Sequence, residues 1–395
     1  MRKVGVCIFD DPTQVGYGFA SVAGEPAKRV NGYGELRTDV LWVINLKIKD
    51  TTKLGLNRSN HIYDEQYFRI SLKQIGLELG LSSDPEAFCR SASEILNRVA
   101  VLGYEMLGVS IDNPGYRYQV LVADKYMPDF CRKKPTGPLS ASIMDATRQS
   151  TQENQAMLGR HAPAGSTAQA FIFPRGSYGR WILSQPIPSC ENWKPFSLSG
   201  SETIVGCDEG SEIRGTKHVI ERLMKHGETN AMFLNVKVES VDRFQRPFST
   251  FGSGANYPRA WATLPEVLSL LRYSKLSIHG GFMTPLRENP IAEKIDLDIN
   301  EISYARSLLI ENLWVAIANP VSTTKRQTPL GAYLRAYDRS VCQKAAEVFE
   351  SYQYAVGSFG IGRVMVYLRA GEITHASNLA LENGLMPTLS ILHGR

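Results

Sequence analysis

The stretch Ala231-Met232-Phe233-Leu234-Asn235-Val236-Lys237-Val238 places Met232, Leu234, Val236 and Val238 at every second position. This alternation is typical of a β-strand with one buried face. A helical pattern precedes the strand at residues 215–226, and a shorter one follows at 265–273. Because helices and strands succeed one another without a regular βα alternation, the sequence predicts an α+β fold.

Further element signals lie on both sides of this strand. Asp84-Pro85 forms an N-cap and first helical position for a helix over 86–102, which Gly103 is expected to end. The runs 104–111 and 116–122 then predict a β-hairpin. The remaining signals are a buried strand at 4–9, a strand-like stretch at 170–188, helices at 299–318 and 332–354, and a strand at 360–368.

A length of 395 residues favours more than one domain. We expect an N-terminal α+β part at 1–128, a basic flexible loop at 129–169, a central α+β part at 170–318, and a C-terminal helical and strand extension at 319–395. No stretch is apolar enough to span a bilayer, and the start lacks a signal-peptide core. The six cysteines contain no Cys-x-x-Cys pair, which favours a reduced, cytoplasmic, soluble protein.

Residues 125–180 are the most basic part of the chain, with eight Lys or Arg residues against three acidic ones. The polar run 135–169 inside this stretch predicts an exposed loop. Basic, flexible loops commonly hold phosphates, although a plain solvated insertion has the same composition. The candidate nucleic-acid-binding residues of this stretch are Arg132, Lys133, Lys134, Arg148, Arg160, Arg175 and Arg180.

A second candidate surface mixes aromatic rings with arginines. Arg243, Phe244, Arg246 and Phe248 precede a stretch with two glycines, outside any periodic pattern. Rings that stack bases while arginines hold the backbone are typical of single-strand binding, although residues at the edge of a core give the same letters. Lys325 and Arg326, in a polar loop between two helices, complete the nucleic-acid-binding candidates.

Catalytic and metal-binding patterns are missing from the sequence. It contains no Walker loop, no Gly-x-Ser-x-Gly elbow and no His-Glu-x-x-His motif, and its histidines form no cluster at ligand spacing. Gly357, Gly360 and Gly362 stand before a strand rather than before a helix, so they predict a turn and not a phosphate loop. We therefore expect no catalytic residue, no metal, no cofactor and no enzymatic activity.

Residues 66–123 can also be interpreted as a winged helix. The second helix would carry Arg90 and Arg98, and the hairpin wing would carry Arg117, which would place the helix in a major groove. Two amphipathic helices before a hairpin also occur in many α+β cores, where these arginines would only solvate a surface.

The order of elements resembles a known family. Its carriers are a strand at 40–48 before two helices, Ala87-Phe88-Cys89-Arg90 to Asn97-Arg98 in the second helix, and a helix that leads into the strand 231–238. The chain is similar in this respect to the repeated guide-RNA-binding backbone subunit, of the RAMP superfamily, in Class 1 CRISPR surveillance complexes, nearest to type I-F. The likeness covers about residues 1–255, and residues 327–395 have no counterpart in it.

The resemblance implies an RRM-like palm with helical and hairpin or loop insertions, an RNA-contacting turn at 243–249, and head-to-tail copies along a guide RNA. The first expectation for function is thus a non-catalytic RNA-binding subunit of an antiviral CRISPR-type ribonucleoprotein. Its partners would be guide RNA, copies of itself, other subunits and target DNA, without a membrane. The alternatives are a winged-helix DNA-binding replication initiator and a viral structural protein with a basic inner face.

Overall fold

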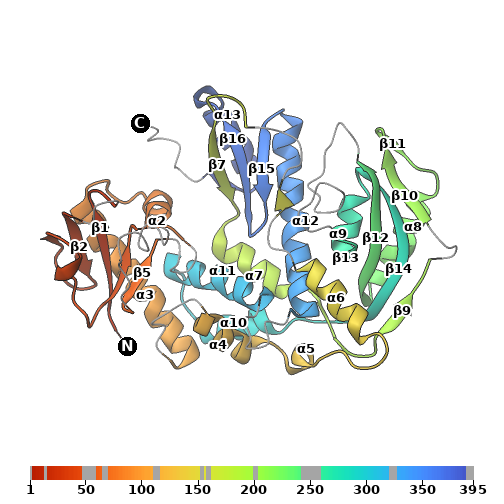
Figure 1. Cartoon of the computed structure of the whole chain (residues 1–395), viewed down its shortest axis with the longest axis horizontal. Coiled ribbons are helices and arrows are strands. Elements are labelled where there is room, and N and C mark those ends of the chain that lie inside the picture. Colours follow the sequence, from red (N-terminus) through yellow and green to blue (C-terminus); the bar gives the residue numbers. More distant parts are fainter. Residues whose placement is uncertain are drawn as a thin grey trace.

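The computed structural model of the chain contains three separate β-sheets joined by helices (Figure 1). This mixed architecture agrees with the α+β expectation. No helix of the described part of the chain is long and apolar enough to cross a membrane. The structure describes residues 2–12, 16–46, 59–64, 70–109, 116–151, 155–156, 162–198, 203–241, 259–319 and 327–387.

The N-terminal sheet has the strand order β3-β2-β1-β4-β5. Its central strand β1 pairs antiparallel with β2 and parallel with β4, which in turn pairs parallel with β5. Val4 and Val6 face one hydrophobic core, whereas Cys7 and Phe9 face another. The strands are β1 (Val4–Phe9), β2 (Gly18–Val22), β3 (Lys28–Val30), β4 (Leu41–Ile44) and β5 (His61–Tyr63), with the short helix η1 (Tyr33–Glu35) beside them.

Helices α2 (Leu72–Leu79) and α3 (Pro85–Leu107) follow this sheet, and α3 packs against β1 and β2. The Asp84 side chain accepts a hydrogen bond from the Ala87 N–H, so the expected N-cap is confirmed. The expected end at Gly103 is wrong, because Gly103 lies buried inside the helix, which closes instead at Gly108 with φ 70°. The helix therefore runs through the first half of the expected hairpin.

The second half of that hairpin is helix α4 (Tyr116–Tyr126). The winged-helix interpretation of residues 66–123 is therefore wrong, because both expected strands of the wing are helical. Tyr and Val in a short apolar run suit a strand as well as a buried helix face, and only packing against α11 (Tyr304–Ala318) decides between them.

The expected flexible loop at 129–169 is also corrected in part. It contains helices α5 (Asp129–Arg132) and α6 (Ser140–Ser150), and α6 buries Ile143, Ala146 and Thr147. The strand expected at 170–188 is shorter, because β7 (Thr167–Ile172) is followed by helix α7 (Arg175–Ser184). Helices α7, α10 (Ile291–Asp298) and α11 form the middle of the molecule, where α11 is buried on nearly every side.

The second sheet is built around two long antiparallel strands, β12 (Asn230–Val241) and β14 (Ser274–Arg287). Gly281 is required at their contact, since a Cβ there would lie 1.9 Å from the Phe233 carbonyl oxygen. The other strands are β8 (Ile187–Pro188), β9 (Lys194–Phe196), β10 (Thr203–Asp208), β11 (Ser211–Glu212) and β13 (Trp261–Thr263), and helices α8 (Thr216–Gly227) and α9 (Leu264–Leu270) pack against the sheet.

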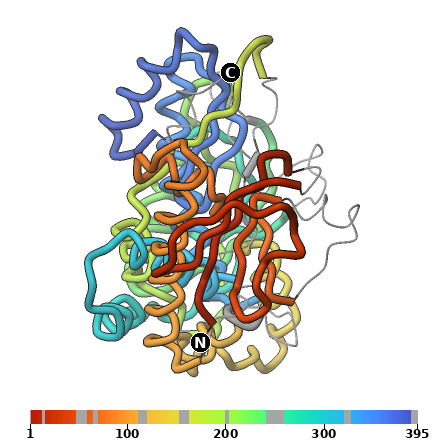
Figure 2. Tube along the Cα trace, turned by 90° about the vertical axis from the view of Figure 1, so that its left-hand side faces the viewer, coloured from red at the N-terminus to blue at the C-terminus, as the bar shows by residue number. Residues whose placement is uncertain are grey.

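The third sheet combines segments far apart in the sequence, in the order β17-β7-β16-β15-β6. Helix α12 (Pro329–Ser351) packs against β15 and β16, and α13 (Ile373–Glu382) packs against β17. The remaining elements are β6 (Gln155–Ala156), β15 (Ala355–Phe359), β16 (Arg363–Leu368), β17 (Met386–Pro387) and the short helix η2 (Ala370–Glu372). Seen from the side, the connection between α10 and α11 stands out from the body of the molecule (Figure 2, cyan).

Candidate nucleic-acid interface

Arg132 lies at the end of α5 and is held by the surface around it. Its guanidinium pairs with Asp124 at 3.4 Å and with Asp129 at 3.7 Å, and it donates hydrogen bonds to the carbonyls of Met127 and Ala123. These contacts fix the end of α4 against α5. A phosphate would have to compete with two carboxylates for this side chain.

The next two cations are more open to solvent. The Lys133 ammonium lies 3.8 Å from the Glu191 carboxylate, and its side chain is 70% exposed. Glu191 also binds Arg287 at 3.0 Å. Lys134 is exposed and has no acidic partner among the described residues. Of the candidates that the structure describes, Lys134 is thus the most available to an anion.

Arg148 projects from α6 into solvent and pairs with Asp145 one turn earlier, at 2.8 Å. An exposed pair at this spacing contributes little to stability and can be opened at small cost. The geometry leaves Arg148 able to reach a phosphate while its own charge is balanced in the free protein.

Arg175, at the start of α7, is part of a buried ion cluster. Its guanidinium binds Glu78 at 2.7 Å and also binds Glu311, and only 12% of its side chain is exposed. Burial alone would raise the pKa of Glu78, but the bonds from Arg175, Tyr304 and Gln74 lower it. This cluster joins α2, α7 and α11, so Arg175 can reach a phosphate only by leaving two carboxylates.

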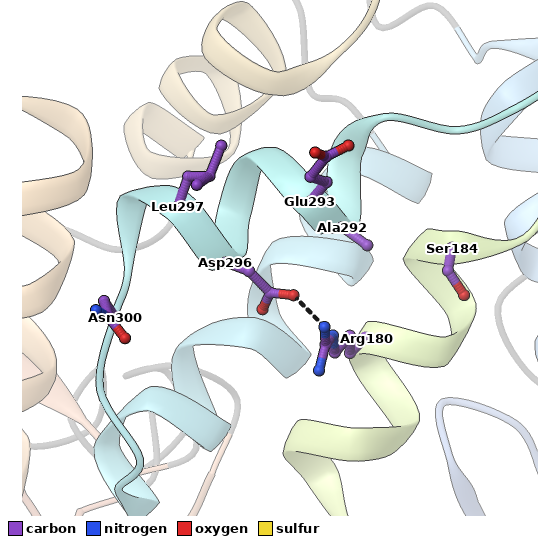
Figure 3. Close-up of a pocket in the computed structure, with 7 residues that line it drawn as sticks. All are labelled: Arg180, Ser184, Ala292, Glu293, Asp296, Leu297 and Asn300. Carbon is purple, nitrogen blue, oxygen red and sulfur yellow. Dashed lines mark ion pairs between the residues drawn. The ribbon is translucent and has the colours of Figure 1, made fainter.

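Arg180 lines a shallow, open pocket of about 500 Å³ between α7 and α10 (Figure 3). Its guanidinium lies 2.7 Å from Asp296, which also binds Arg306 at 2.6 Å. Glu293 stands at the rim of the same pocket. A phosphate at this position would have to compete with Asp296 for Arg180 and would lie near the Glu293 carboxylate.

The other candidates lie outside the described residues, namely Arg160, Arg243, Phe244, Arg246, Phe248, Lys325 and Arg326. The charge balance is nevertheless informative. Of the 44 basic and 39 acidic residues of the chain, 11 and 6 lie outside the described ranges, which leaves 33 of each inside them. The described framework is therefore neutral, and the whole net charge of +5 is carried by the other segments.

The turn between β15 and β16 has a geometry that the sequence did not reveal. Gly360, Ile361 and Gly362 have φ of 124°, 55° and 65°, and a β-branched residue in this region is a clear outlier. The buried carboxylate of Asp338, on α12, accepts hydrogen bonds from the N–H groups of Ile361 (2.7 Å) and Gly362 (2.8 Å). Tyr178 donates a further bond to it at 2.7 Å. The turn expected at Gly360 and Gly362 is confirmed.

A second buried ion cluster was also not predicted from the sequence. The Glu266 carboxylate binds Arg259 at 2.7 Å and Arg339 at 2.9 Å, and all three side chains are almost wholly buried. Burial would raise the pKa of Glu266, but the two arginines lower it to about 2. Arg339 lies 73 residues from Glu266, so no local pattern could have signalled the full Arg-Glu-Arg arrangement.

The carboxylates of the described residues form no metal site. No group of three or more His, Cys, Asp or Glu side chains there is arranged to hold a metal ion. Asp338 and Glu266 are occupied by backbone and arginine donors.

Comparison with solved structures finds DNA polymerases at low sequence identity. Phi29 DNA polymerase complexed with primer-template DNA is 11% identical, with 93% of this chain and 80% of that chain covered at a TM-score of 0.46. Phi29 DNA polymerase complexed with single-stranded DNA gives 12% identity, the same coverage and a TM-score of 0.46. The family B DNA polymerase of the archaeon Pyrobaculum calidifontis gives 9% identity, 98% and 56% coverage and a TM-score of 0.31.

No protein-family model and no curated protein matches the chain. The expectation of a non-catalytic guide-RNA subunit of a CRISPR complex is corrected by the structural matches, which are DNA polymerases. The expectation that the chain is not an enzyme is corrected with it, because polymerases are enzymes. At these TM-scores the likeness concerns arrangement only and assigns no activity.

Proposed function

We propose that the chain binds single-stranded nucleic acid through the phosphates. The observation that carries this proposal is the charge distribution, with a neutral framework and a net charge of +5 on the segments outside it. A cation already balanced by a carboxylate gains less from a phosphate than one without such a partner. Most described candidates are balanced in this way, with Lys134 as the exception.

A single strand is favoured over a duplex by the residues that accompany the unbalanced charge. Phe244 and Phe248 alternate with Arg243 and Arg246 in one short stretch. Rings stack on unpaired bases, each worth about 1–3 kcal/mol, whereas paired bases in a duplex offer no free face. DNA and RNA share this chemistry, and a binding assay with both distinguishes them.

The third sheet provides a surface on which such a strand can lie, and we propose it as an RRM-like palm. Helices α12 and α13 pack on this sheet. On the helix-covered face of β16 lie Val364, Val366 and Leu368, which are buried. The alternate positions of β16, Met365 and Tyr367, are only half-buried. Small side chains opposite them on β7 allow a close approach, and a ring such as Tyr367 is what RRM-type sheets use for stacking.

The test compares two quadruple variants with the same net charge. The first changes Arg243, Arg246, Lys325 and Arg326 to Gln, outside the neutral framework. The second changes to Gln four cations that are 43–61% exposed and each paired with a carboxylate, Arg29, Arg37, Arg272 and Arg287. Affinity for labelled single-stranded DNA, single-stranded RNA and duplex DNA is measured by anisotropy over a salt series.

We expect the first variant to bind more weakly. On a single strand, the slope of log affinity against log salt should fall by about 0.7 for each phosphate that the variant no longer binds. The second variant should keep the slope of the unmodified protein. Equal weakening in both variants would mean that only total charge matters, and the proposal would then fail. Preference for duplex DNA would overturn the single-strand assignment alone.

A further inference from the structure

The pocket between α7 and α10 lies beside two unusually exposed aliphatic side chains. Leu297 is 77% exposed and lines the pocket, and Ile302, on the projecting connection to α11, is fully exposed. Single exposed aliphatic residues are common on protein surfaces. Leu297, in the last turn of α10 beside a pocket of about 500 Å³, and Ile302, on the connection that follows it, together are typical of a surface that contacts another molecule.

The acidic side chains around this pocket are paired with cations, with one exception. Asp296 is bound by Arg180 and Arg306, Asp298 lies 2.9 Å from Lys125, and Glu301 is bound by Arg98. These ion pairs tie the α10 region to α3, α4, α7 and α11, so its surface is held in place. Glu293 is exposed at the rim of the pocket and has no ion pair within the described residues.

We propose that this pocket binds a basic segment of a protein partner. A Lys or Arg side chain of the partner enters with its aliphatic stem along Ala292 and Leu297, and its cation pairs with Glu293. Long basic side chains commonly bury their stems on apolar surface while the charged end stays in a polar site. An apolar side chain of the same segment covers Ile302.

The charge of the pocket distinguishes this occupant from a nucleic acid. Asp296 is neutralised by Arg180 and Arg306, so Glu293 is the lining carboxylate without an ion pair among the described residues, and it favours a cation over a phosphate. The open view in Figure 3 shows the Glu293 carboxylate and the Leu297 side chain on one side of the helix, above the ion pair of Arg180 with Asp296.

The test uses the full chain and two fluorescein-labelled peptides, one alternating Arg with Leu and one alternating Glu with Leu. We expect anisotropy to detect binding of the first peptide only. The variants Glu293→Lys and Leu297→Ser should each weaken that binding about fivefold or more, since one reverses the charge and the other removes the apolar contact. Affinity for nucleic acid should stay unchanged in Leu297→Ser.

The matched control is Glu212→Lys, which reverses the charge of an exposed glutamate on β11, in the second sheet and outside the pocket. It should leave peptide affinity unchanged. Equal weakening by Glu212→Lys would show that the peptide responds only to total charge, and unaltered binding in both pocket variants would place it elsewhere. Either result overturns the proposal, as does equal binding of the two peptides.

Discussion

The two buried ion clusters of this protein have opposite stoichiometry. In one, Arg175 lies between Glu78 and Glu311, and in the other, Glu266 lies between Arg259 and Arg339. The surplus carboxylate of the first is met by neutral donors, the Tyr304 hydroxyl and the Gln74 amide. The surplus guanidinium of the second is met by backbone acceptors, the carbonyls of Ser150 and Trp261.

This difference shows how a buried charge in excess can be accommodated. In these two clusters the extra anion is met by side-chain donors, whereas the extra arginine uses free backbone carbonyls at the end of α6 and the start of β13. The arginine-rich cluster is also the more deeply buried, with side chains 1–7% exposed against 6–18% in the other. We therefore expect it to be the less tolerant of substitution.

The largest effect is expected from Glu266→Gln. The change keeps the shape of the side chain but leaves two buried guanidinium groups without an anion, which costs about 3–5 kcal/mol of unfolding free energy. Urea denaturation followed by circular dichroism measures this loss. Glu212→Gln, at an exposed position, serves as control, and a loss below about 1 kcal/mol would contradict the central role of Glu266.

A pH titration tests the contribution of Glu266 to the unfolding free energy without a substitution. The pKa of Glu266 is about 2 in the folded chain and near 4.5 in the unfolded one, so its stabilising contribution is complete above pH 4.5 and is lost as pH falls toward 2. This contribution is about 3 kcal/mol at most. Unfolding free energy measured over this window should fall less steeply in Glu266→Gln than in the unmodified protein.

Arg175→Met should have a smaller effect than Glu266→Gln. The substitution leaves Glu78 and Glu311 without their cation, but a carboxyl can take up a proton and these two are less deeply buried. We expect a loss of about 2 kcal/mol at neutral pH, and less at pH 5, where protonation of the glutamates relieves it. A loss that grows on acidification would contradict this account.

The smallest effect is expected from Arg148→Ala. Its pair with Asp145 lies on the surface, so the unfolding free energy should change by less than about 0.5 kcal/mol. The same urea denaturation assay measures this change in unfolding free energy. The salt series for nucleic-acid binding shows separately whether Arg148 contacts a phosphate. A larger stability change would remove the distinction between buried and exposed pairs on which this series rests.

Local signals predicted some elements well and others poorly. The N-cap at Asp84 and the strand at 231–238 are confirmed, because capping and alternation are set by neighbours in sequence. Residues 104–107 and 116–122 of the expected hairpin are helical, and the helices α3 and α4 to which they belong both pack against the distant α11. Long-range contacts decide between strand and helix for such short apolar runs.

The candidate site residues show the same contrast between local and long-range information. Sequence composition located the stretches rich in cations, but it could not tell which of these cations have acidic partners. Arg175 and Lys134 look equivalent in the sequence, yet one is buried between two glutamates and the other is exposed. Both glutamates lie about a hundred residues or more from Arg175, beyond the reach of any local pattern.

The turn held by Asp338 has a consequence for the order of folding. A β-hairpin normally closes on its own, in about 1–10 μs, from contacts within a few residues. Between β15 and β16, the strained amides of Ile361 and Gly362 bind a carboxylate 23 and 24 residues earlier, on α12. This turn is completed only once α12 has packed against the sheet. The β15–β16 hairpin therefore closes after this tertiary contact has formed, not before it.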